Sequence, residues 1–323
     1  MNKVLKILYI NVIEQNAGWG AETFINKEFQ AFGHNVTNLD FRKHRRVLAT
    51  KLNEVADFDV LFLQRGDRFP IYLLKACNRP LFFWASELVS RNRDQNILLK
   101  SNLFDHIFVR SEDCMKRIIK NQWVDKQNIS ILLSGFDEEL HKKEYISKDI
   151  DILFVGSMLS RRKKILRELQ TEFNIRICKA FGKEMSNLFN RSKIVLNIHA
   201  EEFLDTETRI YESLGCGAFV ISEKLSSENP FIPNMHYIEV NNIDEMKNQI
   251  NYYLDNPIER ENIAQNGYKE AKSKHSYQTR AEQLINKFNQ YVTVSSKETF
   301  NTKKLTFYSN IERVANSFRK TYK

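Results

Sequence analysis

The chain has 323 residues, of which 42% are hydrophobic and 28% are charged, and it contains only 10 glycines and 5 prolines. These values are typical of folded proteins and exclude a fibrous or disordered chain, while the length favours two domains of roughly 150 residues each. Lysine and arginine outnumber aspartate and glutamate by 49 to 40, and the net charge of +9 indicates an anionic partner such as a nucleotide, nucleic acid or an acidic lipid surface.

Cysteine spacing and hydropathy argue against a secreted or membrane-spanning protein. Cys77, Cys114, Cys178 and Cys216 are far apart and lack Cys-x-x-Cys spacing, so neither a disulfide framework nor a zinc site is expected, and the thiols indicate a cytoplasmic protein. The apolar run near the start ends at Glu14 without a cleavage site of small residues, so it is interpreted as a strand. No apolar stretch reaches the length of about 18 residues that a membrane span requires.

The first half of the chain alternates short apolar runs with helical patterns. The apolar residues of each run are mostly continuous, as in strands that are covered by helices on both faces. Strands are predicted at 4–11, 36–41, 59–64, 80–86, 106–111 and 129–134, and helices at 21–32, 46–56, 71–77 and 111–121. This alternation predicts a doubly wound α/β domain with a parallel sheet.

After a polar segment at 134–149 the same pattern begins again. Strands are predicted at 151–157, 174–178, 193–198, 218–222 and 237–240, and helices at 161–171, 183–191, 206–214, 243–254, 257–271 and 276–291. We therefore expect domains at 1–148 and 149–300, two Rossmann-like halves that face one another across a cleft.

Residues 301–323 form a third segment, a basic amphipathic helix. From Ser295 onward, seven basic residues face only Glu298 and Glu312, so +5 of the net charge lies here, and a second basic cluster lies at 42–46. A stripe of apolar residues on such a helix usually packs on its own protein, so we expect it to pack back on the N-terminal domain. Peripheral contact with a membrane surface is the alternative.

Two turns place small residues between a strand and the helix that follows it. Gly18 and Gly20 follow the first strand and allow a ligand to approach the backbone at a helix N-terminus. In the second half, Gly156 and Ser157 occupy the equivalent position.

The helix after Gly156 opens with basic residues, among them Arg161 and Arg162. Cations at a helix N-terminus oppose the helix dipole by about 0.3–1 kcal/mol each, and a bound diphosphate would reverse that balance. An exposed basic turn is the alternative interpretation.

A third polar cluster follows the strand at 193–198. That strand ends at Asn197 and His199, and the next helix carries Arg209 and Glu212 on one face. A pair with this spacing on a helix surface usually contributes only about 0.2–0.5 kcal/mol to the stability of the helix. Here it lies at the carboxyl end of a central strand, where parallel sheets bind ligands.

The motifs DILFVGS (151–157), KIVLNIH (193–199) and TRIYESLGCGAFVIS (208–222) together resemble the C-terminal half of GT-B glycosyltransferases, particularly the CgeB-like group related to family 4. The resemblance is strongest over 150–290, and in the first half it rests on GWGAE (18–22) and SGFDEEL (134–140). It implies a hexosyltransferase of GT-B fold that binds an acceptor in its first domain and a nucleotide-sugar, most often a UDP-sugar, in its second. It also implies retention of configuration and no metal cofactor.

The resemblance implies roles for individual residues. Glu212 would accept hydrogen bonds from the ribose hydroxyls, Arg209 would clamp the diphosphate, and Arg161 or Arg162 would stabilise the departing nucleoside diphosphate. Gly215 and Gly217 would allow close packing behind the site. The implied donor site comprises Gly18, Gly20, Gly156, Ser157, Arg161, Arg162, Asn197, Arg209 and Glu212.

One position departs from the family pattern. Family 4 enzymes commonly carry a glutamate eight positions before the ribose-binding one, where this chain has Leu204. The residues that can substitute for it are Glu201, Glu202, Asp205 and Glu207. The catalytic candidates are Asp205, His199 and Glu87, which follows the strand at 80–86 and is a possible acceptor-activating base.

Other interpretations remain open. The DFD motif at 57–59 spells a metal-binding D-x-D, but it enters a strand instead of leaving it, so no metal site is expected. The acceptor can be a glycan, a protein or a nucleic acid, and the basic segments motivate a DNA-base glycosyltransferase. A nucleotide-sugar epimerase and a non-catalytic binding scaffold are the further alternatives.

Overall fold

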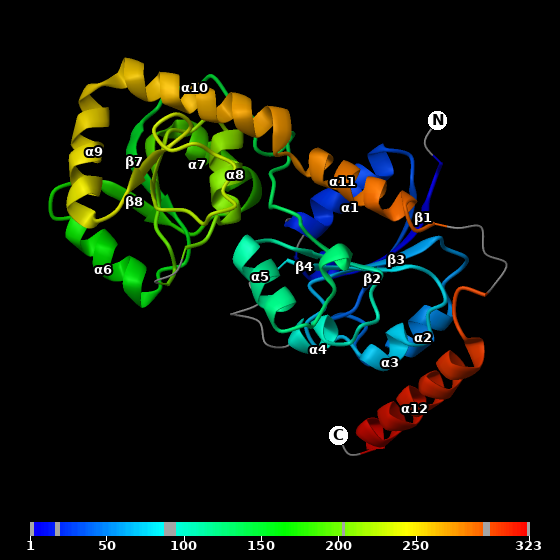
Figure 1. Ribbon diagram of the computed structural model, residues 1–323. Coiled ribbons are helices and arrows are strands. Elements are labelled where there is room, and N and C mark those ends of the chain that lie inside the picture. Colours follow the sequence, from blue (N-terminus) through cyan, green and yellow to red (C-terminus); the bar gives the residue numbers. More distant parts are fainter. Residues whose placement is uncertain (1–2, 17–19, 87–94, 202–203, 293–297, 322–323) are drawn as a thin grey trace. The chain divides into compact units, whose positions relative to one another are not determined.

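The computed structural model describes residues 3–16, 20–86, 95–201, 204–292 and 298–321. The chain divides into two compact units (Figure 1). Unit 1 comprises residues 1–133 and 281–323, and unit 2 comprises residues 134–280.

Unit 1 contains a six-stranded parallel sheet with the strand order β2-β1-β3-β4-β5-β6. β3 and β4 are buried along their whole length, which explains their continuous apolar sequences. The strands are β1 (Lys6–Asn11), β2 (Asn35–Asp40), β3 (Val60–Gln64), β4 (Leu81–Ala85), β5 (His106–Val109) and β6 (Ile129–Ile131). The helices are η1 (Ile13–Asn16), α1 (Ala21–Ala31), α2 (Leu48–Asn53), α3 (Ile71–Leu74), α4 (Asn96–Leu99), α5 (Glu112–Lys120) and η3 (Lys126–Asn128).

Unit 2 contains a five-stranded parallel sheet with the order β11-β10-β9-β7-β8. Its strands are β7 (Ile150–Val155), β8 (Ile175–Cys178), β9 (Ser192–Asn197), β10 (Val220–Glu223) and β11 (Ile238–Val240). Its helices are α6 (Ser160–Leu169), α7 (Gly182–Arg191), α8 (Thr208–Gly215), α9 (Ile243–Asp255) and α10 (Pro257–Lys274). The two parallel α/β sheets confirm the predicted fold class.

The units do not end where the sequence analysis placed the domain boundaries, at 148/149 and 300/301. Most of α11 (Tyr277–Asn289) belongs to unit 1, because Phe288 packs its ring against Phe82 of β4 and Phe62 of β3, with centroid distances of 4.5 and 5.4 Å. Residues beyond α11 join the same unit, since the backbone of Asn301 donates to the carbonyl of Ala76 at 2.8 Å. The chain therefore returns to unit 1 after completing unit 2.

The C-terminal helix α12 (Thr302–Thr321) packs on α2, which confirms the expected return to the N-terminal domain (Figure 1). The Glu312 carboxylate accepts hydrogen bonds from the backbone N–H groups of Ala49 and Thr50, at 2.8 and 3.1 Å. These two N–H groups lie in the first turn of α2, so Glu312 both satisfies free donors and lies at the favourable end of the helix dipole. No helix in the described part of the chain has the length and apolar character needed to cross a membrane.

Gly215, at the end of α8, makes a close contact within unit 2. A Cβ atom at this position would lie 2.4 Å from Cδ2 of the buried Phe136 ring. Close packing around this glycine therefore involves an aromatic side chain from the first residues of unit 2.

We expect Gly215→Ala to lower the free energy of unfolding by about 1 kcal/mol or more, because the new methyl group overpacks the Phe136 ring. Urea unfolding checks this value. The double variant Gly215→Ala/Phe136→Leu should lose less than the sum of the single variants, because the smaller side chain removes the clash. Strict additivity would contradict the contact as its cause.

Candidate active site

The polar residues singled out in the second half of the sequence meet at one edge of the unit 2 sheet. β9 lies between β7 and β10 and runs parallel to both. The carboxyl ends of the three strands are therefore neighbours, and they bring together Gly156, His199 and Glu223. Ligands bind at this edge in open α/β sheets.

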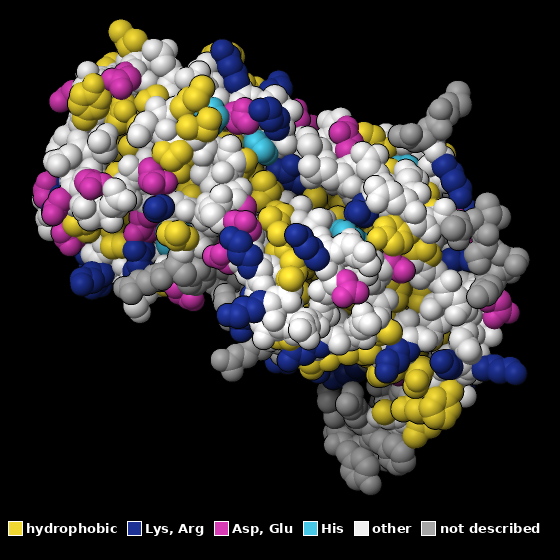
Figure 2. Space-filling model, in the orientation of Figure 1, with side chains coloured by type: hydrophobic (Ala, Val, Ile, Leu, Met, Phe, Trp, Pro, Cys, Tyr) yellow, Lys and Arg dark blue, Asp and Glu magenta, His cyan; other side chains and the backbone are white. Residues whose placement is uncertain are grey.

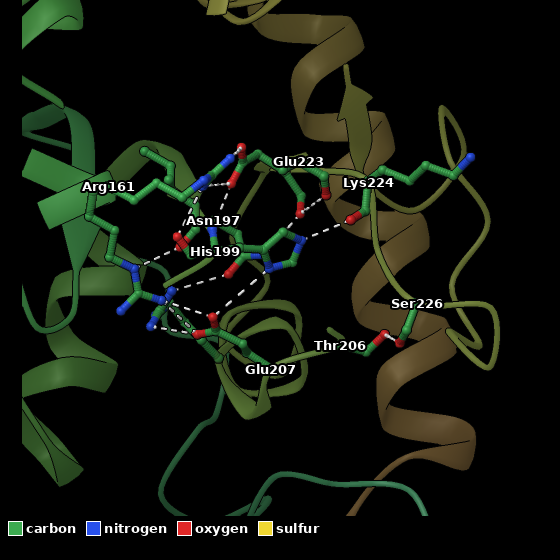
Figure 3. A network of polar contacts seen from close by, with 12 residues as sticks. Arg161, Asn197, His199, Thr206, Glu207, Glu223, Lys224 and Ser226 are labelled. Atoms are coloured by element: carbon green, nitrogen blue, oxygen red, sulfur yellow. Dashed lines mark hydrogen bonds and ion pairs between the residues drawn. The ribbon is translucent and has the colours of Figure 1, made fainter. Parts of the chain in front are cut away.

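Glu207 is the centre of the polar network at this edge (Figure 3). Its carboxylate accepts two hydrogen bonds from Nη2 of Arg162, at 2.8 and 3.0 Å, and a third from Nη2 of Arg209, at 3.0 Å. Arg162 is only 4% exposed, and its Nε also donates to the carbonyl of Ile198 at 2.8 Å. The network thus fixes two guanidinium groups in place.

The two guanidinium groups pack against the same aromatic ring. The Cζ atoms of Arg162 and Arg209 each lie 5.5 Å from the ring centroid of Phe154, a fully buried residue of β7. Both contacts are within the range of cation–π attraction. Arg209 also donates from Nη1 to Oδ1 of Asn197 at 3.1 Å, and a Cβ atom at Gly156 would lie 3.0 Å from its Nη2.

A second ion pair lies beside the first. Arg161 donates from both terminal nitrogens to Glu223, at 2.8 and 2.5 Å, and from Nη1 to the carbonyl of His199 at 3.1 Å. Figure 3 shows these contacts converging on the end of β9. Arg161 and Arg162 therefore bind carboxylates of the protein itself. From the sequence, the two cations oppose the dipole of α6, and a bound diphosphate would offset that cost. In the structure, the carboxylates of Glu223 and Glu207 already offset it.

His199 holds the loops of the site together. Its ring Nε2 lies 2.8 Å from the carbonyl oxygen of Lys224, its Nδ1 lies 3.9 Å from Oε1 of Glu207, and its backbone N–H donates to Glu223 at 2.6 Å. Burial alone would lower the pKa of His199, but the nearby Glu207 and Glu223 carboxylates and the hydrogen bond to the Lys224 carbonyl outweigh burial and leave the pKa raised. Both ring nitrogens face protein groups, which is the geometry of a positioning residue.

Glu212 lies one turn after Arg209 on α8, in a different environment from Glu207. Its Oε1 is 3.9 Å from Nε2 of His141, a buried residue. Burial lowers the pKa of His141 to about 4, so this imidazole is neutral at pH 7. Burial raises the pKa of Glu212 to about 7, with Arg209 opposing the shift. The carboxyl group of Glu212 therefore titrates near neutral pH.

This shift predicts a pH dependence of stability. The pKa of Glu212 lies at about 7 in the folded protein, above its ordinary value of 4.5, so the native protein is destabilised as pH rises between these two values. We expect Glu212→Gln to remove that slope, so that its stability relative to the wild type improves from pH 4.5 to pH 7. Urea midpoints across this range measure it. Glu184→Gln, at an exposed position on α7, is the control and should follow the wild type. Parallel curves for all three proteins would contradict the assignment.

The remaining predicted residues are distributed over both units. Ser157 accepts through its carbonyl from Arg162 Nη1 at 3.4 Å, and Asp205 is buried in the segment before α8. Leu204, at the position of the expected acid, is 48% exposed. Gly20 precedes α1 in unit 1 with a φ of 114°. Gly18, Glu87 and Glu202 lie outside the described residues.

Two residues of the network were not assigned a role from the sequence. The sequence indicates Glu207 only as one of four replacements for the missing acid, and it assigns no role to Glu223. Glu223 is the last residue of β10, so the rule that placed Asn197 at the edge also identifies it. Glu207 comes two residues before Arg209, a spacing that carries no pairing signal.

The DFD motif makes contacts that hold unit 1 together. Asp57 pairs with Arg79 Nη2 at 3.0 Å, and Asp59 accepts from the backbone N–H of Lys6 at 2.8 Å. Across the described ranges, no group of three or more His, Cys, Asp or Glu side chains is arranged to hold a metal ion.

Comparison with known proteins identifies relatives of the second half and of the whole fold. Residues 147–286 match the glycosyl transferase-like family. An uncharacterized protein of Acanthamoeba polyphaga mimivirus is 31% identical over 192 residues, which cover 53% of this chain and 67% of that protein.

Two solved structures share the architecture at low sequence identity. Sucrose-phosphate synthase from Thermosynechococcus elongatus aligns with a TM-score of 0.67 at 11% identity, over 88% of this chain and 98% of that chain. Anabaena HepE in complex with UDP-glucose aligns with a TM-score of 0.59 at 14% identity, over 88% of this chain and 100% of that chain. The chain therefore belongs to one family with the mimivirus protein, its residues 147–286 match the glycosyl transferase-like family, and its two α/β units have the GT-B fold.

Proposed function

We propose that this protein transfers a hexose from a UDP-sugar to an acceptor, with retention of configuration and without a metal ion. Unit 2 binds the donor and unit 1 the acceptor. The family match and the structural likeness to a UDP-glucose complex support a nucleotide-sugar donor. The Arg-x-x-Glu spacing of Arg209 and Glu212 further supports membership of the CgeB-like group.

The observation that carries the proposal is the fixed position of Arg209 at the carboxyl edge of the sheet. A guanidinium group has five N–H donors, and the contacts to Asn197 and Glu207 involve one terminal nitrogen each. The other donors suit the oxygens of a diphosphate, which guanidinium binds in a bidentate manner. Because Glu207, Asn197 and the Phe154 ring hold the side chain beforehand, little reorganisation is needed when the ligand binds.

This arrangement suits the chemistry of glycosyl transfer. When the bond between the sugar and the diphosphate breaks, negative charge grows on the departing nucleoside diphosphate. Preorganised cations that face this charge lower the barrier, which is the function that a metal ion serves in other enzymes. Arg209 is the group that we assign to this role, and Glu212 is assigned to the ribose hydroxyls.

Release of nucleoside diphosphate tests the proposal. The full chain is incubated with UDP-glucose, other UDP-sugars and a purine nucleotide-sugar. The nucleoside diphosphate that is released is measured with and without EDTA. We expect UDP release that EDTA leaves unchanged and that Arg209→Ala reduces. No release from any donor, or release by Arg209→Ala at the wild-type rate, would contradict the assignment. A second assay with glycan, protein and duplex DNA acceptors identifies the acceptor class, and NMR of the product anomer tests retention.

A further inference from the structure

The helix α12 has one face that packs on unit 1 and one that faces outward. Leu305 is buried, Ser309 lies 2.8 Å from the hydroxyl of Thr50, and Tyr308 packs on Tyr72 at a centroid distance of 4.5 Å. With Glu312, these residues form the inner face of the helix, which α2 and α3 cover. The helix is therefore anchored by contacts that leave its other side uncovered.

The outer face of α12 is apolar. Phe307, Ile311 and Val314 are 61%, 51% and 55% exposed. Their spacing of four and then three residues places them in one stripe along the helix. Figure 2 shows hydrophobic side chains gathered where α12 lies in that view, with lysine and arginine side chains beside them. Single exposed apolar residues are common, but a stripe of three on one helix marks an interaction surface.

Basic residues flank this stripe. Lys303 and Lys304 are exposed in the first turn of α12. At the other end, the side chain of Asn316 donates to the carbonyl of Arg46 at 3.0 Å, which brings the exposed Arg45 and Arg46 beside the helix. The only acidic residue of α12, Glu312, is on the inner face. The outer face thus combines apolar side chains with positive charge.

We propose that the outer face of α12, defined by Phe307, Ile311 and Val314 with their basic flanks, docks on an anionic lipid membrane. An interfacial helix inserts its apolar stripe into the boundary between head groups and acyl chains, while long basic side chains reach the phosphates. Nucleic acid would bind the basic residues but would leave the apolar stripe in water. A second copy of this chain would bring two positive faces together, which is unfavourable.

Vesicle sedimentation with the full chain tests the proposal. The probes are phosphatidylcholine vesicles with and without phosphatidylglycerol. We expect binding to the anionic vesicles only. The triple variant Phe307→Ser/Ile311→Ser/Val314→Ser should bind on the order of 100-fold more weakly, because three apolar side chains no longer leave water. Lys303→Gln/Lys304→Gln should bind on the order of 30-fold more weakly.

Matched substitutions elsewhere serve as controls. Ile258→Ser replaces an apolar residue on α10 that is even more exposed, at 80%, and Lys269→Gln/Lys272→Gln removes two exposed lysines from the same helix. Both control variants should bind vesicles as the wild type does. The thermal midpoint of every variant is compared with that of the wild type, and the lysine variant keeps the test decisive if the triple variant is less stable.

Several outcomes would overturn the proposal. These are equal binding to neutral and anionic vesicles, no binding to either, or wild-type binding by both α12 variants. If the protein does not bind vesicles but self-associates, and the triple variant abolishes the self-association, the face would be assigned to contact with a second copy of this chain. Tight binding to duplex DNA that the triple variant retains, again without vesicle binding, would assign it to nucleic acid. Because the readout is binding and not turnover, it is independent of the proposed sugar transfer.

Discussion

Replacement of Glu207 by glutamine is expected to lower the free energy of unfolding by about 3–5 kcal/mol, the usual loss when one partner of a buried ion pair is removed. Glu207 binds Arg162 through both of its oxygens and Arg209 through one. Arg162 is 4% exposed, so without the carboxylate its charge would remain buried and only partly compensated. Urea unfolding at pH 7 measures the loss.

Two other glutamates provide the comparison for this variant. Glu223→Gln should lose less, because its partner Arg161 has a side chain that is 27% exposed and therefore better hydrated. Glu184→Gln, at an exposed position, should change the free energy of unfolding by about 0.5 kcal/mol or less. Equal losses for Glu207→Gln and Glu184→Gln would show that Glu207 does not hold the network together.

The sheets of both units were predictable because strand signals are local. Continuous apolar runs such as DVLFLQ and DILFVGS are sufficient to identify strands buried on both faces. The gathering of polar residues at one edge was also predictable, since the carboxyl ends of parallel strands meet on one side of a sheet. Asn197, His199 and Gly156 were located by this reasoning, and they do lie together.

The partners of the arginines were not predictable, because pairing depends on contacts between distant parts of the chain. Arg161 binds a residue 62 positions away and Arg162 one 45 positions away. The dipole argument correctly identified that these cations need an anion, but no sequence pattern distinguishes a ligand from a carboxylate of the protein. The extent of unit 1 depends on tertiary contacts for the same reason, since α11 follows unit 2 in the chain while Phe288 packs on the sheet of unit 1.

The raised pKa of Glu212 also depends on tertiary structure. His141 approaches it from the polar segment at 134–149, which lies between the two series of predicted strands, and burial sets the pKa values of both side chains. From sequence, Arg209 and Glu212 form an ordinary pair one turn apart on a helix. In the structure the pair is divided, because Arg209 joins the network of Glu207 and Glu212 faces a neutral imidazole.

This division predicts different ligand selectivities for variants at the two positions. If Arg209 binds the diphosphate and Glu212 binds the ribose, Arg209→Ala should weaken UDP binding by about 1–3 kcal/mol and leave uridine binding unchanged. Glu212→Ala should weaken the binding of both ligands, because each contains the ribose hydroxyls. Isothermal titration with UDP, and competition of uridine against it, measure the two affinities. Arg167→Ala, at an exposed position on α6, is the matched control and should bind both ligands normally. A uridine affinity that falls with Arg209→Ala as much as the UDP affinity does would mean that the guanidinium group acts on the fold of the site and not on the diphosphate.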